Sequence, residues 1–239
     1  VVLLHCLVLQ KRFLSIRALH INHQLSDNAD YWQRHCESLC ADLEVPLTSI
    51  TVDVRSGLAG NQDGLENAAR NCRYQAFEEN IVSGETLLLA HHADDQYETM
   101  LLRLMRGAGV RGLSAIPPRR ALGLGYLLRP LLAMPRQRLL DYAQNSQLSW
   151  IEDESNQDSH FDRNFCRNEV LPLLAMRWPN YRSSWAKSSQ LLGEADELMQ
   201  ALAELDMAAA ATEEASVLNL GALQLLSQAR LRNTIRCCW

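Results

Sequence analysis

Residues 85–113 read ETLLLAHHADDQYETMLLRLMRGAGVRGL, and this stretch decides the fold that the chain is expected to adopt. The short apolar run at residues 86–90 is typical of a strand buried on both faces of a parallel sheet. The spacing of Asp95 and Glu98 predicts a capping box and a helix that starts there. Apolar side chains then recur at intervals of three and four, which gives the helix one apolar face. These positions are Tyr97, Leu101, Leu104, Met105 and Ala108. Thr99, Arg103 and Arg106 fall together on the other, polar face, and Gly107 and Gly109 are predicted to end the helix.

Four ionisable side chains, His91, His92, Asp94 and Asp95, lie between the predicted strand and the predicted helix. Open α/β sheets bind their ligands at this place, beyond the carboxyl ends of the strands. A helix N-terminus favours anions, yet two carboxylates occupy this one, and a divalent cation between them and a phosphate would reconcile the two facts. The alternative is a purely structural turn, with one Asp as the N-cap, one solvated and one His packed.

The rest of the chain alternates between helical and strand patterns, which predicts an α/β fold with a doubly wound parallel sheet, followed by a helical region. The polar residues His20, Asn22 and His23 come at the end of another predicted strand, so both polar clusters are expected along one edge of the sheet. The predicted helices cover residues 1–9, 65–82, 136–145 and 181–205, and a further helix follows the capping residues 26–28. The predicted strands cover residues 13–21, 47–54, 86–90 and 126–132, and a loop is predicted at residues 56–64.

A second dense polar stretch, IEDESNQDSHFDRNFCR, occupies residues 151–167. It contains Glu152, Asp153 and Asn156, and then Arg163 and Arg167, which lie one helical turn apart and can present their guanidinium groups on one face. The alternative is an acidic surface loop followed by a capped helix.

Composition limits the class of protein. The formal net charge is −5, so the chain lacks an overall basic footprint. Any RNA contact would use local patches, such as Arg163, Arg167, Arg177 and Arg182, or a part of the protein outside this sequence. The seven cysteines form no C-x-x-C pair, which argues against a zinc ribbon. No apolar run is long enough to span a membrane and no signal peptide is recognisable, so a cytoplasmic protein is expected.

Three segments together resemble one family, the bacterial tRNA(Ile)-lysidine synthetases. They are residues 92–99 (HADDQYET) with Arg106 to Gly109, residues 20–25 (HINHQL), and the polar residues from Glu152 to Arg167 with Pro172. The family belongs to the N-type ATP pyrophosphatases, whose PP-loop domain has the adenine nucleotide alpha hydrolase-like fold. The resemblance implies a PP-loop domain at residues 1–180, a helical linker at 181–207 and the start of a substrate-recognition domain at 208–239.

The resemblance also implies an activity. A member of this family uses ATP and Mg²⁺ to adenylate C2 of the wobble cytidine of tRNA(Ile) with a CAU anticodon, and free L-lysine then displaces AMP to form lysidine. A homodimer is left open and no membrane is involved. The implied catalytic residues are His92, Asp94, Asp95 and Arg106, with Asp94 and Asp95 as metal ligands. The nucleotide would be bound by His20, Asn22, His23 and Gly107. Lysine or tRNA would be bound by Glu152, Asp153, Asn156, Arg163, Asn164 and Arg167.

One departure from the family pattern is the phosphate loop. The Ser-Gly-Gly-x-Asp-Ser sequence that precedes the segment matching residues 1–7 is not in the chain, and we expect it upstream, with further C-terminal domains beyond Trp239. Residues 1–239 alone are therefore expected to be inactive. Two alternatives stay open: a 2-thiocytidine synthetase, although that enzyme relies on C-x-x-C pairs, and a non-catalytic tRNA-binding remnant.

Overall fold

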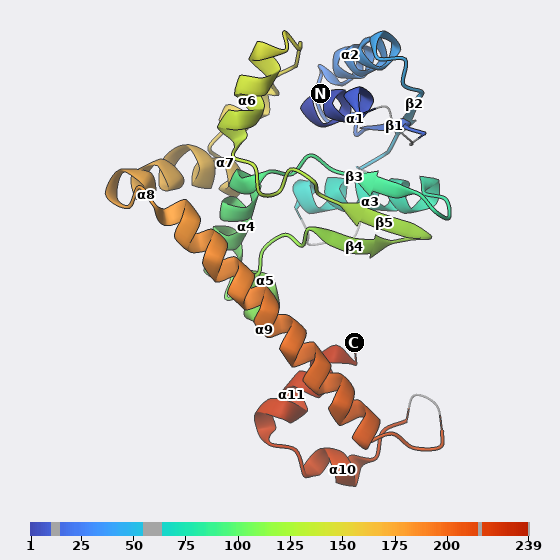
Figure 1. Cartoon of the computed structure of the whole chain (residues 1–239), viewed down its shortest axis with the longest axis vertical. Helices are drawn as coiled ribbons and strands as arrows, with labels where there is room; N and C mark the ends of the chain where they lie inside the picture. Colours follow the sequence, from blue (N-terminus) through green and yellow to red (C-terminus); the bar gives the residue numbers. More distant parts are fainter. Residues whose placement is uncertain (11–14, 55–63, 215–216, 239) are drawn as a thin grey trace. The chain divides into compact units, whose positions relative to one another are not determined.

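The computed structural model describes residues 1–10, 15–54, 64–214 and 217–238. Apart from Gly64, the predicted loop at 56–64 lies outside the described residues, as do residues 13 and 14 of the first predicted strand. The chain forms two compact units (Figure 1). The first comprises residues 1–95 and 117–156, and the second comprises residues 96–116 and 157–239.

The first unit is an α/β unit with helices on both sides of its strands. Strand β1 pairs in parallel with β2, from Ala18 opposite Leu47 to Asn22 opposite Thr51. Strand β5 pairs in parallel with β3 and antiparallel with β4. The elements of this unit are α1 (Val2–Leu9), β1 (Ala18–Asn22), α2 (Ala29–Asp42), β2 (Leu47–Thr51), α3 (Leu65–Asn80), β3 (Thr86–Leu88), β4 (Arg119–Leu122), β5 (Gly125–Leu128), α6 (Arg136–Asn145) and the first residues of the 3₁₀ helix η2 (Glu154–Gln157).

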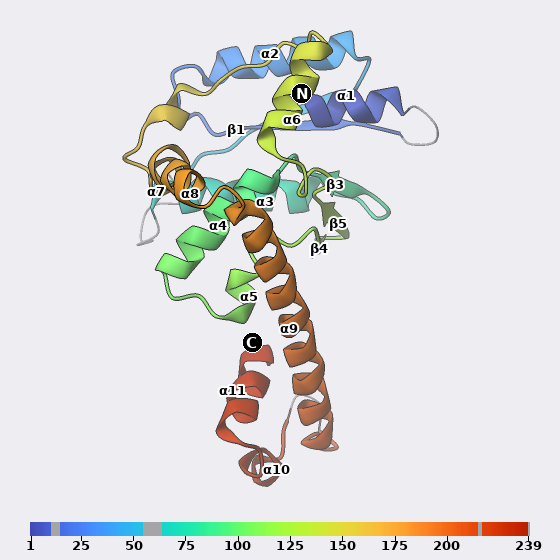
Figure 2. The same ribbon diagram turned by 60° about the vertical axis from the view of Figure 1, so that its left-hand side comes forward.

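The core of the first unit lies between α3 and the strands. Its buried centre is formed by Phe77 of α3, by Ile81 directly after that helix, and by Leu122 and Leu127 of the β4–β5 hairpin. Apolar side chains of β1 and β3 pack against the same centre, so both sets of strands share one core. Helices α1 and α2 lie on the other side of β1 in both views (Figures 1 and 2). This arrangement confirms the predicted doubly wound α/β fold.

Strand β4 was not predicted, and its antiparallel pairing with β5 makes that sheet mixed. The arginine pair at its start hides the strand pattern, because β-propensity favours branched and aromatic residues. The turn of the hairpin uses Gly123 at φ 51°, a left-handed conformation that glycine adopts without strain. At Gly125 a Cβ atom would lie 2.4 Å from the carbonyl oxygen of Glu85, so only glycine fits there.

The second unit is helical. Helix α11 lies beside α9 in both views (Figures 1 and 2). Polar contacts join the two helices: Arg230 bonds to the buried carboxylate of Asp206, and Asn233 Nδ2 donates to the carbonyl oxygen of Met199 at 2.6 Å. The unit contains most of α4 (Ala93–Met105), α5 (Val110–Leu113), α7 (Asp162–Phe165), the π-helix η3 (Cys166–Val170), α8 (Leu171–Arg177), α9 (Tyr181–Ala209), α10 (Leu220–Gln224) and α11 (Gln228–Cys237).

Helix α4 follows the predicted apolar face only over its first turns. Tyr97 and Leu101 are each 8% exposed, but Leu104 and Met105 are 51% and 70% exposed. The predicted polar side makes the tertiary contact instead, because the guanidinium of Arg103 donates to the carbonyl oxygens of Gly112 and Ala115 at 2.8 and 2.6 Å. The prediction of one continuous apolar face was therefore wrong for the last turn. None of the helices described is both long and apolar enough to cross a bilayer.

Candidate functional site

The turn between β3 and α4 carries the polar cluster predicted from the sequence. Helix α4 begins at Ala93, so His92 is the residue before its first turn. The backbone N–H of His92 donates to Oδ2 of Asp95 at 2.8 Å, which satisfies a donor at the start of the helix. The predicted capping box of Asp95 and Glu98 was wrong, because the helix starts earlier and Asp95 itself closes the cap.

Asp94 and Asp95 are both held by backbone donors. Asp94 Oδ2 accepts a hydrogen bond of 2.8 Å from the N–H of Arg136, the first residue of α6. The Nδ1 atom of His92 lies 3.8 Å from Asp94 Oδ2 and 3.5 Å from Asp95 Oδ2. The structure thus brings together three predicted catalytic residues, His92, Asp94 and Asp95, in the first unit.

A cavity of about 280 Å³ opens beside this turn. Arg70, Arg73 and Tyr74 of α3 form one wall, and residues 89–92 with Asp95 form the other. Sequence reasoning placed the two arginines in a helix but did not assign them to the site. Their spacing of three residues puts both on one helix face, and that was the signal available.

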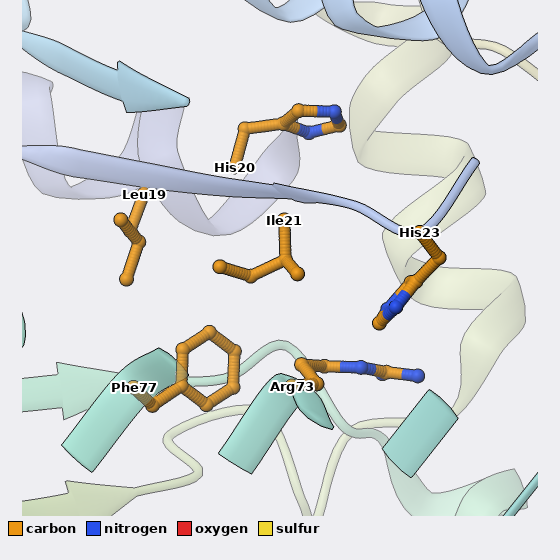
Figure 3. Close-up of a pocket in the computed structure, with 6 residues that line it drawn as sticks. All are labelled: Leu19, His20, Ile21, His23, Arg73 and Phe77. Atoms are coloured by element: carbon orange, nitrogen blue, oxygen red, sulfur yellow. The ribbon is translucent and has the colours of Figure 1, made fainter. Parts of the chain in front are cut away.

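A second cavity, of about 310 Å³, lies between β1 and α3 and also contacts Arg73 and Phe77. Figure 3 shows Leu19, Ile21 and His23 on the side of β1 that faces these two residues, whereas the His20 ring points to the other side. Since both cavities share residues of α3, the polar ends of β1 and β3 border the same helix. The sequence predicted both polar clusters along one edge of a single sheet, whereas β1 and β3 belong to two separate sheets.

His20 of β1 and His23, which follows that strand, are held towards their neutral forms. Burial lowers the pKa of His23, and the nearby Arg73 and His20 lower it further. Its Nδ1 atom is buried and has no hydrogen-bond partner among the residues described. Burial also lowers the pKa of His20, against an opposing effect of Glu37. A neutral imidazole beside a guanidinium leaves this wall of the cavity with positive charge and little negative charge.

Asn22 has a local structural role. It is 4% exposed, and its Nδ2 donates to Gln33 Oε1 at 3.0 Å. Its Oδ1 accepts from the N–H of Gln24, which has a φ of 50°. These bonds hold the turn after β1, and the predicted contact of Asn22 with a nucleotide stays a prediction.

In the second unit a buried carboxylate joins two predicted site residues. Glu98 is fully buried, at 0% exposure. It accepts hydrogen bonds from Arg163 Nε at 2.8 Å, Arg167 Nε at 2.6 Å and Arg167 Nη2 at 3.0 Å. The two guanidinium groups do lie on one face, as predicted, but sequence reasoning missed Glu98 because its partners lie more than sixty residues further along the chain.

Arg106, Gly107 and Asn164 also belong to the second unit. Arg106 Nη2 lies 3.6 Å from Asp162 Oδ2, in a pair whose side chains are 66% and 76% exposed, and such pairs contribute little to stability. Gly107, with φ 69°, ends α4 as predicted. Asn164 is 9% exposed and its Nδ2 donates to the carbonyl oxygen of Asp158 at 3.0 Å.

Three of the residues predicted to bind lysine or tRNA, Glu152, Asp153 and Asn156, lie at the end of the first unit. Asp153 Oδ1 accepts from the N–H and the hydroxyl of Ser155, at 2.9 and 2.7 Å. The N–H of Asn156 donates to the carbonyl oxygen of Asp153 at 3.0 Å, whereas Glu152 is exposed. Asp153 therefore caps the turn of η2, and the roles of these residues towards a substrate stay predictions.

The model of the PP-loop domain family matches residues 1–174. The chain belongs to the PP-loop domain family. This membership agrees with the α/β fold of the first unit and with the resemblance found in the sequence.

Several curated relatives of the PP-loop chain are named tRNA(Ile)-lysidine synthase. That of Pseudomonas syringae pv. tomato is 47% identical over 244 residues, covering 98% of this chain and 54% of its own length. The relative from Serratia proteamaculans is 50% identical over 204 residues, which are 84% of this chain and 46% of the relative. The relative from Coxiella burnetii is 41% identical over 239 residues, which are 98% of this chain and 52% of the relative. The chain thus spans about half the length of the curated relatives it matches.

A solved structure supports the fold. The U34-tRNA thiolase NcsA from Methanococcus maripaludis, solved with its [4Fe-4S] cluster, matches with a TM-score of 0.62 and 12% sequence identity, covering 100% of this PP-loop chain and 76% of that one. At this identity the likeness concerns the fold alone.

Proposed function

We propose that the complete protein is an ATP-dependent ligase that attaches lysine to C2 of the wobble cytidine of tRNA(Ile). The observation that carries the proposal is the turn of His92, Asp94 and Asp95, which ends a parallel strand beside an arginine-lined cavity. The similarity to tRNA(Ile)-lysidine synthases selects the reaction among those that such a site supports. The cytidine C2 oxygen attacks the α-phosphorus of ATP, pyrophosphate leaves, and a lysine amine then displaces AMP from C2 and loses a proton.

The donor set of the turn fits a magnesium ion. Among the residues described, no group of three His, Cys, Asp or Glu side chains is arranged to hold a metal. Mg²⁺, however, usually takes one or two protein carboxylates and completes its shell with water and phosphate oxygens. Asp94 and Asp95 would be those ligands, and the ion would neutralise charge on the departing pyrophosphate.

The histidine and the arginines have separate roles in this proposal. His92, within 4 Å of both carboxylates, orients them and accepts or passes on a proton. Arg106 is proposed as a cationic clamp on phosphate, as are Arg163 and Arg167, whose guanidinium groups are fixed by Glu98 and remain 28% and 30% exposed.

Lysine must attack as the free amine, so its ammonium form has to be held and then deprotonated. Glu152 and Asp153 are the proposed carboxylates for this step, with Asn156 beside them. His20, His23 and Gly107 are proposed to contact the nucleotide, and the lowered pKa of His23 suits a neutral hydrogen-bonding role.

The test is lysine transfer by the complete natural protein. Radiolabelled lysine, ATP and Mg²⁺ are supplied with a tRNA(Ile) transcript that carries the CAU anticodon, and label is measured in the RNA. The matched control is the same transcript with uridine in place of the wobble cytidine, which should take up no label. If the protein binds the transcript but neither consumes ATP nor transfers lysine, it is the non-catalytic alternative and the proposal fails.

A further inference from the structure

A second group of basic residues surrounds Tyr74 in the first unit. The guanidinium carbon of Arg120, in β4, lies 4.4 Å from the centroid of the Tyr74 ring, and that of Arg70, in α3, lies 4.9 Å from it. Arg129 Nη2 lies 3.3 Å from the Tyr74 hydroxyl oxygen and donates to it. Three cationic side chains from three places in the sequence therefore meet at one ring, and we call them the Tyr74 arginine cluster.

The Tyr74 arginine cluster is not neutralised by any ion pair among the residues described. Neither Arg70, Arg120 nor Arg129 forms an ion pair with a described carboxylate. The groups that affect the pKa of Arg129 are, besides burial, Tyr74 and the other two arginines, and none of them is acidic. Like charges held close together repel each other. A bound anion would reduce the repulsion among the three guanidinium groups and would therefore be bound favourably.

Arg129 shows that part of the cluster is built into the fold. It is 4% exposed, and its Nη1 donates to the carbonyl oxygen of Pro117 at 2.6 Å. Its buried Nε atom has no hydrogen-bond partner in the described part of the chain. A buried polar group is normally paired, because an unmade hydrogen bond costs free energy. Arg70 and Arg120 are exposed, so the cluster has both a buried base and an accessible rim.

The cluster also borders the candidate site. Arg70 and Tyr74 line the 280 Å³ cavity, whose opposite wall carries His91, His92 and Asp95. An anion held by the rim would therefore sit at the mouth of this cavity. Guanidinium groups bind phosphate strongly, since their N–H groups can form two parallel charge-assisted hydrogen bonds with it.

We propose that the Tyr74 arginine cluster is a binding site for a phosphate group at the mouth of the cavity. The phosphate can come from the RNA backbone or from a nucleotide, and the chemistry of recognition is the same for both. This site would bind a substrate of the proposed reaction. The proposal rests on the proposed function only in taking tRNA(Ile) as the RNA.

The chain offers a matched control. Arg119 precedes Arg120 on β4, and successive strand residues point to opposite faces. Its guanidinium carbon lies 3.9 Å from the centroid of the Tyr126 ring, so it has the same kind of aromatic contact without Tyr74. Arg120→Gln and Arg119→Gln thus remove the same charge from the same strand, and Arg70→Gln tests the second rim residue from α3.

The experiment measures binding by the complete protein, without turnover. One arm titrates a tRNA(Ile) transcript at several salt concentrations, and the other titrates ATP. If the phosphate belongs to RNA, Arg120→Gln and Arg70→Gln should each weaken transcript binding about fivefold to tenfold and reduce the salt slope by about one, with ATP binding unchanged. If it belongs to the nucleotide, the loss should appear in the ATP arm.

Either result supports the site, provided that Arg119→Gln matches the unmodified protein. The proposal is overturned if all three variants behave alike in both arms, or if the cluster variants lower the melting temperature without changing either affinity. Loss of lysine transfer by the unmodified protein, with cluster-dependent binding intact, would instead refute the proposed reaction and leave the phosphate site standing.

Discussion

Replacing Glu98 should destabilise the second unit more than any surface charge change. Glu98→Gln keeps the size of the side chain and removes the charge that holds Arg163 and Arg167. Breaking a buried ion pair by removing one partner costs about 3–5 kcal/mol, and hydrogen bonds to charged groups contribute about 1.5–3 kcal/mol each. Because the arginine side chains are 28% and 30% exposed, water stabilises part of the charge left behind, and the expected cost falls below that of a fully buried ion pair.

We therefore expect Glu98→Gln to lower the free energy of unfolding by about 2–3 kcal/mol, and Glu98→Ala by about 1 kcal/mol more because a cavity is added. For a unit of about 100 residues, each kcal/mol lost lowers the melting temperature by roughly 4–8 °C. The assay is unfolding in urea, monitored by circular dichroism. The urea concentrations at the midpoint are compared between variants whose unfolding free energy depends on urea concentration with the same slope.

The matched control is Glu197→Gln, which removes the same charge from an exposed position on α9 and should change stability by less than about 0.5 kcal/mol. A double-mutant cycle of Glu98→Gln with Arg167→Gln should give a coupling of about 1–3 kcal/mol. If Glu98→Gln is as mild as the control, or the coupling is zero, the buried ion pairs do not hold this unit together and the reasoning is refuted.

Three further outcomes are expected. Asp94→Asn and Asp95→Asn should each reduce lysine transfer about a hundredfold with the far-ultraviolet spectrum retained, as for loss of an electrostatic stabiliser; near-normal rates and Mg²⁺ dependence in both would contradict the site. The hydrogen bond from Arg17 lowers the pKa of Glu85 to about 2 from its usual value near 4.5, so the stability from this pair is present above pH 4.5 and is lost as the pH falls towards 2. Acid unfolding of Glu85→Gln should lack that component, and an unchanged acid titration would show that the pair contributes nothing. Gly125→Ala should destabilise the first unit by about 1–3 kcal/mol because its Cβ would collide with the Glu85 carbonyl oxygen; a neutral effect in thermal unfolding would mean that the backbone relaxes there.

Local patterns predicted most of the fold. Periodicity gave α6 its observed bounds, Arg136–Asn145, and placed the long helix that begins at Tyr181. The strand before His91 and the left-handed stop at Gly107 were also predicted, because each depends on a few neighbouring residues. Strand β4 was missed because Arg119 and Arg120 conceal it, and its pairing depends on β5.

The candidate site was predicted less completely than the fold. The cluster of His92, Asp94 and Asp95 could be found because it is contiguous in sequence. The partnership of Glu98 with two arginines and the meeting of three arginines at Tyr74 could not, since these contacts join residues that are far apart in the chain. The spacing of residues along a helix or strand predicts contacts between near neighbours in sequence, and it does not predict contacts between residues that are far apart in the chain.

The division of the chain into units has a consequence for how the protein is made. Residues 96–116 belong to the second unit but lie between β3 and its neighbour β5, so the two units are interleaved along the chain. During synthesis β3 cannot pair with β5 until residues 125–128 have been made. The carboxylate of Glu98 in α4 cannot be neutralised until Arg163 and Arg167 have been made. Neither unit can be produced as one uninterrupted piece: residues 1–95 would lack β5, and residues 157–239 would lack Glu98. Limited proteolysis within 96–116 should therefore unfold both units, whereas a cut between independent domains would leave each intact.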